Sequence, residues 1–224
     1  MPTFFDAPRA YLNFALGLRA YLKNTATESE VNETIIRQLA NREDNFVQLV
    51  KANIFDNPHS PYLPLFKAAK LTYADVQQMV ARQGLEQTLE ELYDADVYIT
   101  FEEFKGRVPI KREIVEFLPK DSDFDSLNLT PIMFGHTGGS TGKPAHTRLD
   151  LDYMAQTAHY VALEMSVHSR FDAPMVIWRG LLPDFVGVAA VLRRAYLGQR
   201  VDRWFTTWHG NDANLGWYYT LLTY

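Results

Sequence analysis

The chain has 224 residues, and its 22 lysines and arginines against 27 aspartates and glutamates give a formal net charge of −5 at pH 7. Hydrophobic residues make up 47% and charged residues 22%, which is typical of a folded domain with a sizeable core. The mild negative charge argues against nucleic acid or an anionic membrane surface as a partner, and no apolar run is long enough for a transmembrane helix. Because the chain has no cysteine, disulfides, thiolate nucleophiles and cysteine-based zinc sites are excluded. The first residues lack the features of a secretory signal, so we expect a cytoplasmic protein.

The N-terminal part of the chain is predicted to be helical. Apolar side chains recur at helical spacing from residue 10 to about residue 55, and we expect this stripe to pack in the core. Within it, Thr27 followed by Glu30 has the spacing of a capping box. Pro58 and Pro61 then end the helical stretch, because proline restricts its own backbone and that of the preceding residue.

Three shorter helical segments are predicted next. Thr72 is expected to cap a helix that stops at Gly84. Thr88 and Glu91 repeat the capping-box spacing before another turn or two of helix. Thr100 begins one more turn.

The next residues mark a change of character. Residues 119–126 are acidic and loop-like, but they lack the glycine and the terminal glutamate of a calcium-binding loop. We place a boundary there, with residues 1–120 mainly helical and residues 121–224 forming an α/β portion. Both are interpreted as parts of one incomplete large domain.

The second portion alternates between strand and helix patterns. Short apolar runs predict strands at 132–134, at 175–178, where we expect a buried strand, and at 200–205. Between them, helical spacing predicts helices from about residue 150 and over 185–197. The order strand, helix, strand, helix, strand predicts a βαβ arrangement with parallel pairing.

One segment points to chemistry, the glycine-rich run Phe134-Gly-His-Thr-Gly-Gly-Ser-Thr-Gly-Lys-Pro144. Its glycines let successive backbone N–H groups converge on an anion. The hydroxyls of Thr137, Ser140 and Thr141 add donors, and Lys143 adds a positive charge. This composition suits a polyphosphate.

Two common phosphate loops do not fit this segment. A Walker A loop needs a glycine five places before Gly142, where Thr137 stands, and a serine or threonine after the lysine, where Pro144 stands. The dinucleotide fingerprint needs a glycine two residues before Gly139, and Thr137 occupies that position too.

The loop at 137–144 resembles the Ser/Thr/Gly-rich phosphate loop of the adenylate-forming superfamily, and within it the phenylacetate–CoA ligase-like branch. Residues 57–66 and 104–112 are similar to the N-terminal approach in that branch. The resemblance covers roughly residues 57–200, with one specific motif and two weaker ones.

The resemblance implies the first part of the large N-terminal domain of an ATP-dependent ligase, in which a small carboxylic acid is adenylated and then usually joined to CoA. The implied cofactors are ATP, Mg²⁺ and CoA. The residues implied to bind the ATP phosphates are Thr137, Gly138, Gly139, Ser140, Thr141, Gly142 and Lys143. Trp178 and Phe185 are candidates for the acyl pocket, although we favour core packing for each.

Several functional groups of the family are missing after Leu197. We find no glutamate for magnesium, no aspartate for the ribose and no mobile C-terminal lysine, so no catalytic or metal-binding residue is assigned. We therefore expect an N-terminal fragment that is inactive alone. The alternatives are a non-catalytic nucleotide- or phosphate-binding remnant, and a half-enzyme completed by a companion chain. The aromatic C-terminus is also compatible with a homo-oligomer.

A hydrolase ranks below these alternatives. Gly138-Gly-Ser-Thr-Gly142 matches the G-x-S-x-G pattern formally, with Ser140 as the nucleophile, but an elbow serine lies between a strand and a helix. Among the histidines, His136 and His146 flank the loop, and His168 is expected in the core at a helix end.

Overall fold

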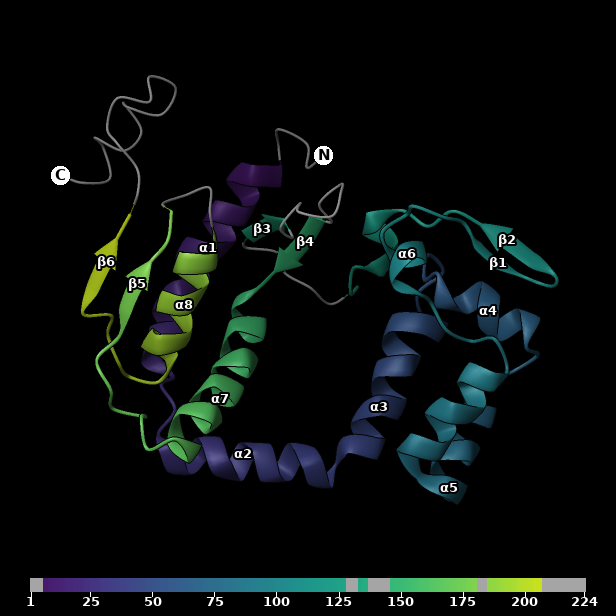
Figure 1. Cartoon of the computed structure of the whole chain (residues 1–224), viewed down its shortest axis with the longest axis horizontal. Helices are drawn as coiled ribbons and strands as arrows, with labels where there is room; N and C mark the ends of the chain where they lie inside the picture. The colour runs from purple at the N-terminus through teal and green to yellow at the C-terminus, as the bar shows by residue number, and fades with distance from the viewer. Residues whose placement is uncertain (1–5, 128–132, 137–145, 181–184, 207–224) are drawn as a thin grey trace. The chain divides into compact units, whose positions relative to one another are not determined.

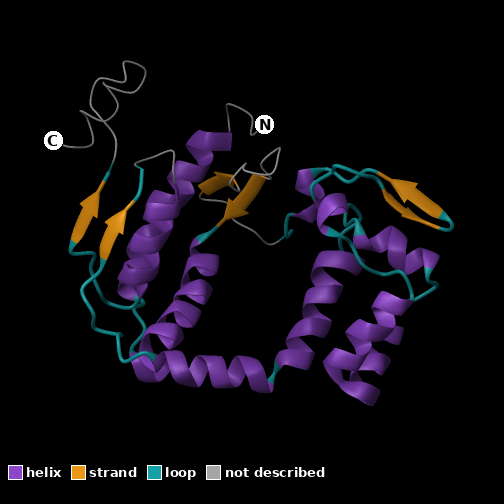
Figure 2. Cartoon of the chain, viewed as in Figure 1, coloured by secondary structure: helices purple, strands orange, loops and turns teal. Residues whose placement is uncertain are grey.

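The structure is a computed structural model, and most of its residues lie in helices (Figures 1 and 2). The residues it describes are 6–127, 133–136, 146–180 and 185–206. Their strands form three two-stranded sheets. The predicted mixture of helix and sheet is thus confirmed.

The chain divides into two compact units. Unit 1 comprises Met1–Leu16 and Asn32–Leu151, and unit 2 comprises Gly17–Val31 and Asp152–Tyr224. The division at residue 120 stays a prediction.

The N-terminal residues are helical, as predicted. The elements are α1 (Asp6–Lys23), α2 (Glu28–Ala40), α3 (Arg42–Val50) and a π-helical turn, η1 (Lys51–Phe55). The expected capping box begins α2: the Thr27 N–H donates to Glu30 Oε2 at 2.8 Å, and the Glu30 N–H donates to Thr27 Oγ1 at 3.4 Å. Two backbone donors at the helix start are thereby satisfied.

Unit 1 is built on a helical core. Its further elements are α4 (Tyr62–Ala68), α5 (Tyr73–Asp94), α6 (Phe101–Phe104), β1 (Ile110–Arg112), β2 (Val115–Phe117) and a 3₁₀ turn, η2 (Asp121–Phe124). Strands β1 and β2 pair antiparallel. The buried core consists of Val50, Ile54, Leu65, Phe66, Val76, Met79, Val80, Leu92, Val97 and Ile110.

Helix α5 bears out one predicted cap and corrects another. Thr72 and Asp75 form a reciprocal capping box, and the helix is broken where expected, at Gly84, whose φ of 82° and ψ of 176° are non-helical. The predicted capping box at Thr88 is wrong. The helix resumes directly after Gly84, so the buried Thr88 hydroxyl donates to the Gly84 carbonyl at 2.7 Å instead of capping a new start.

A buried ion pair joins α6 to β1. Arg112 Nη1 lies 2.7 Å from Glu103 Oε1, and the two side chains are only 8% and 7% exposed. Arg112 also donates to the carbonyls of Asp96 and Tyr98, and its guanidinium lies 4.2 Å from the Tyr98 ring centre. Burial alone raises the pKa of Glu103, but hydrogen bonds from Arg112 and Thr100 outweigh it and lower that pKa to about 2.

The last strands of unit 1 correct the predicted pairing. Strand β3 (Met133–His136) pairs antiparallel with β4 (His146–Leu149), a strand that the sequence did not predict. Parallel pairing was expected because the next recognised element was a helix. Residues 146–149 contain a histidine, a threonine and an arginine and lack an apolar run, so they gave no strand signal.

Unit 2 contains the parallel pair that the βαβ pattern predicts. Its elements are α7 (Leu151–Val167), β5 (Val176–Trp178), α8 (Phe185–Tyr196) and β6 (Arg203–Phe205). Strands β5 and β6 are parallel, with Ile177 opposite Trp204, and α8 connects them. A Cβ on Gly187 of α8 would come within 2.5 Å of the Trp204 ring, so glycine allows helix and strand to approach closely.

The segment 17–31 completes the core of unit 2. The Tyr21 hydroxyl donates to the Leu192 carbonyl at 2.9 Å, and the Ala26 N–H donates to the Tyr196 carbonyl at 2.8 Å. The prediction that His168 is buried is wrong. Helix α7 ends at Val167, and His168 is exposed in the turn that follows.

Candidate functional site

The predicted phosphate loop is carried by the hairpin of β3 and β4. The strands pair from Met133↔Leu149 to His136↔His146, so the last paired residues directly flank residues 137–145. The residues predicted to hold phosphate lie outside the described part of the chain: Thr137, Gly138, Gly139, Ser140, Thr141, Gly142 and Lys143. The structure therefore fixes the backbone on both sides of the loop.

The charged side chains of the hairpin segment are all positive. Residues 133–149 include Lys143 and Arg148 but no aspartate or glutamate. A polyphosphate approaching the loop would meet no carboxylate from the segment itself. This charge pattern agrees with an anionic ligand.

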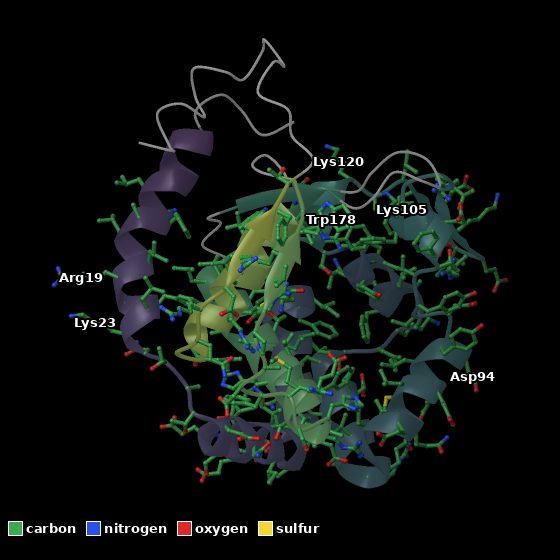
Figure 3. All side chains as sticks on the ribbon, turned by 60° about the vertical axis from the view of Figure 1, so that its left-hand side comes forward. Arg19, Lys23, Asp94, Lys105, Lys120 and Trp178 are labelled. Carbon is green, nitrogen blue, oxygen red and sulfur yellow. The ribbon has the colours of Figure 1, made fainter. Side chains whose placement is uncertain are left out.

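Of the two candidate acyl-pocket side chains, the structure describes only that of Trp178. Trp178 was favoured as a core residue, but its side chain is 74% exposed (Figure 3). Side chains alternate along a strand, so Val176 and Trp178 share the exposed face of β5 while Ile177 is buried. The prediction that both Trp178 and its strand are buried is therefore wrong. The side chain of Phe185 lies outside the described residues.

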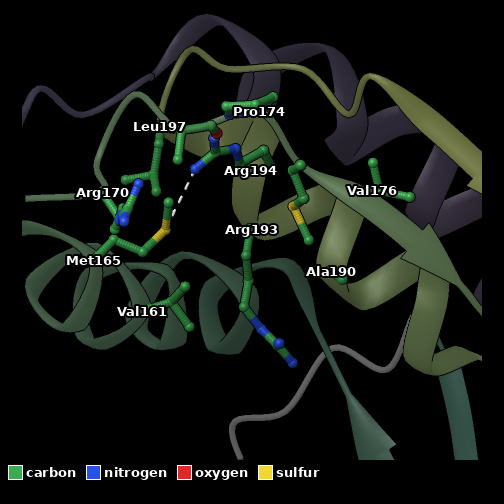
Figure 4. A pocket seen from close by; sticks show the side chains of 11 residues that line it. Val161, Met165, Arg170, Pro174, Val176, Ala190, Arg193, Arg194 and Leu197 are labelled. Atoms are coloured by element: carbon green, nitrogen blue, oxygen red, sulfur yellow. Dashed lines mark hydrogen bonds between the residues drawn. The ribbon is translucent and has the colours of Figure 1, made fainter. Parts of the chain in front are cut away.

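Unit 2 contains a cavity of about 330 Å³ between α7, α8 and the segment before β5 (Figure 4). Much of its wall is apolar, formed by Val161, Met165, Ala173, Pro174, Met175, Val176, Ala190 and Leu197. The remaining lining residues are Arg170, Arg193 and Arg194. No aspartate or glutamate is among these lining residues, so the cavity is both apolar and positively charged.

Arg194 is the most buried of these arginines. The residue is 5% exposed, and its guanidinium donates to the Met165 sulfur at 3.3 Å and to the carbonyls of Phe171, at 3.2 Å, and Ala173. Its Nε is buried without a hydrogen-bond acceptor among the described residues. Burial is the main cause of a lowered Arg194 pKa.

Two carboxylates near Arg194 are engaged elsewhere. Asp172 and Asp202 line an adjoining cavity of about 660 Å³, which shares Ala173, Pro174 and Arg194 with the first. Asp202 Oδ2 accepts from the Met175 N–H at 2.7 Å, and Asp172 Oδ1 accepts from Gln199 at 3.5 Å. Both favour the charged form of Arg194 from a distance, but neither forms an ion pair with it.

Among the described side chains, no group of three or more histidines and carboxylates could hold a metal ion. No helix in the described ranges combines the length and apolar character needed to cross a bilayer.

Arg194 was not among the residues predicted from the sequence to belong to a site. Its signal was its position on α8, where Gly187, Ala190 and Arg194 are separated by three and four residues and so share a face. A charged residue on the packed face of a helix is unusual and indicates a special environment.

Comparisons of the chain with models of protein families, with curated proteins and with solved structures found no match in any of the three.

Proposed function

We propose that residues 137–143 bind the polyphosphate of ATP, and that the chain is the N-terminal portion of a carboxylate-adenylating ligase. The observation that carries the proposal is the sequence Thr-Gly-Gly-Ser-Thr-Gly-Lys, directly flanked by the paired strands β3 and β4. Its hydroxyl and backbone N–H donors suit phosphate oxygens, and its one charged residue is a lysine.

The proposed division of labour follows from the residue types. Thr137, Ser140 and Thr141 donate hydroxyl hydrogen bonds to phosphate oxygens, the glycines leave the backbone N–H groups accessible, and Lys143 supplies charge. Mg²⁺ would enter with ATP, and CoA would accept the acyl group in the complete ligase. No residue of this chain is assigned to hold Mg²⁺, so we expect binding without turnover by the chain alone.

The hairpin also bears on the hydrolase alternative. A nucleophile elbow places its serine between a strand and a helix, whereas the segment that contains Ser140 runs from β3 into the paired strand β4. We therefore do not propose a hydrolase.

Calorimetric titration with Mg-ATP tests the proposal. We expect saturable binding that the Thr141→Ala, Lys143→Ala double variant abolishes, because the variant removes a hydroxyl donor and the positive charge from the loop. Lys67→Ala, which removes an exposed lysine on α4, is the matched control and should bind ATP normally. Equal binding by the double variant and by the unchanged chain would refute the proposal.

A second measurement separates ligase from remnant. ATP–pyrophosphate exchange in the presence of assorted carboxylic acids should be absent with the chain alone and should appear when the missing part of a ligase is supplied as a companion chain. Binding of ATP without exchange under any such complementation would favour a nucleotide-binding remnant.

A further inference from the structure

We infer that residues 213–224 dock on the face of the β5–β6 sheet that points away from α8. We call this the open face, and its residues are Val176 and Trp178 of β5 and Arg203 and Phe205 of β6. The inference concerns unit 2 alone and does not depend on ATP binding by residues 137–143.

The open face is apolar and exposed. Trp178 and Phe205 lie opposite each other in the parallel register and are 74% and 51% exposed, and the neighbouring Val176 is 55% exposed. The other face of the sheet packs on α8, where the Trp204 ring lies against Gly187 (Figure 1). Parallel sheets are normally covered on both faces. Since the described residues cover only one face of this sheet, the open face calls for a second layer.

Residues 213–224 have the composition that such a layer needs. The segment contains no aspartate, glutamate, lysine or arginine, and seven of its twelve residues are leucine, tryptophan or tyrosine. Aromatic side chains bury large apolar areas and gain further from packing on one another. Trp178 and Phe205 therefore suit an occupant that is rich in aromatic residues.

The connection to β6 favours this segment over a separate molecule. Strand β6 ends at Phe205, and only residues 206–212 lie between it and the segment. An extended chain of that length spans about 20 Å, which exceeds the length of about 10 Å for three residues of a strand. Gly210, Asn211 and Asp212 are residue types that favour a reversal of chain direction. A tether this short gives the segment a high effective concentration at the open face.

The charges of the two parts are compatible with docking. Arg203 is the one charged residue of the open face, and Asp212 is the one aspartate, glutamate, lysine or arginine in residues 207–224. Docking therefore brings no like charges together, whereas like charges in an interface would oppose it.

Photo-cross-linking of the whole chain tests the inference, because a chain without cysteine can be labelled at one introduced position. Val176→Cys carries a benzophenone on the open face. Val167→Cys is the matched control and carries the same group at the exposed end of α7, outside the open face. Mass spectrometry then identifies the cross-linked peptides. We expect residues 213–224 to be the main intramolecular target from position 176, with at least a tenfold lower yield from position 167.

Two substitutions in the chain labelled at position 176 test the contact itself. Trp178→Ala removes the largest side chain of the open face, and Tyr160→Ala removes an exposed aromatic side chain of α7 outside that face. We expect Trp178→Ala to lower the yield at least fivefold and Tyr160→Ala to leave it unchanged. The inference would be overturned by the absence of cross-links to residues 213–224, by equal yields from positions 176 and 167, or by an undiminished yield with Trp178→Ala. Cross-links from position 176 mainly to a second copy of the chain would also overturn it.

Discussion

The buried pair of Glu103 and Arg112 should dominate the acid sensitivity of unit 1. Glu103→Gln keeps the shape of the side chain but removes its charge, which leaves the buried Arg112 guanidinium with only the more distant carboxylate of Asp96, whose Oδ1 lies 4.0 Å from the Arg112 Nε. Breaking a buried pair from one side costs about 3–5 kcal/mol. Because Arg112 keeps its bonds to the carbonyls of Asp96 and Tyr98, we expect the lower end, about 3 kcal/mol at pH 7.

The lowered pKa of Glu103 reflects the same interaction and leads to a similar magnitude. Its fall from 4.5 to about 2 corresponds to about 3 kcal/mol, at about 1.4 kcal/mol per pKa unit. Since the folded-state pKa is the lower one, this stabilisation is fully present above about pH 4.5 and is lost as the pH falls toward 2. The difference between the unchanged chain and Glu103→Gln should therefore shrink across that window.

The assay is urea unfolding at several pH values between 7 and 2.5. Hydrogen exchange of the amides in residues 97–112 reports the unfolding of unit 1. Tryptophan fluorescence provides an internal control, because all four tryptophans lie at residue 178 or beyond and hence outside unit 1. Glu102→Gln is the matched variant. Its carboxylate is 51% exposed and pairs with Arg107, so it should cost less than about 1 kcal/mol. Equal losses for the two variants, or a Glu103→Gln loss that persists undiminished at pH 2.5, would refute the reasoning.

Three further changes test the packing and the helix geometry. Gly187→Ala should destabilise unit 2 by about 1–3 kcal/mol, because the new methyl group would overlap the Trp204 ring. Urea unfolding monitored by tryptophan fluorescence measures the loss, and an unchanged unfolding midpoint would contradict the close approach of Gly187 to Trp204. Gly84→Ala should destabilise unit 1 by about 1–3 kcal/mol, since a φ of 82° with a ψ of 176° is accessible almost only to glycine. The rate of amide hydrogen exchange over α5 should rise, and an unaltered rate would argue against this backbone conformation. Thr72→Ala should cost about 1 kcal/mol through loss of the N-cap, while Thr72→Ser, which keeps the hydroxyl, should be nearly neutral; the comparison fails if both variants melt alike.

Local sequence signals predicted the helices well because caps and breakers act within a few residues. The boxes at Thr27 and Thr72 satisfy backbone N–H groups within three residues of the threonine, and the break in α5 lies at Gly84 itself. Thr88 shows the limit of such signals. The same spacing has no capping role once the residue lies inside a helix that has already begun.

Features that depend on tertiary neighbours were harder to predict. Trp178 looks like a core residue by type, yet the alternation of β5 places it on the side opposite the buried Ile177. Strand β4 forms by pairing with β3 and has no apolar pattern of its own. The role of Arg194 depends on carbonyls at residues 171 and 173, whose position the helix pattern of α8 does not reveal.

The discontinuity of unit 2 has a consequence for the order of folding. The bond from Tyr21 to Leu192 spans 171 positions, and the residues between 31 and 152 belong to unit 1. During synthesis the first piece of unit 2 emerges long before its partners, whereas unit 1 needs only nearby sequence for most of its core. Closing so long a loop is entropically unfavourable until the intervening residues are compact. Unit 1 should therefore fold first on the ribosome. A destabilising substitution in the core of unit 1 should delay the folding of unit 2, although no residue of unit 2 is changed.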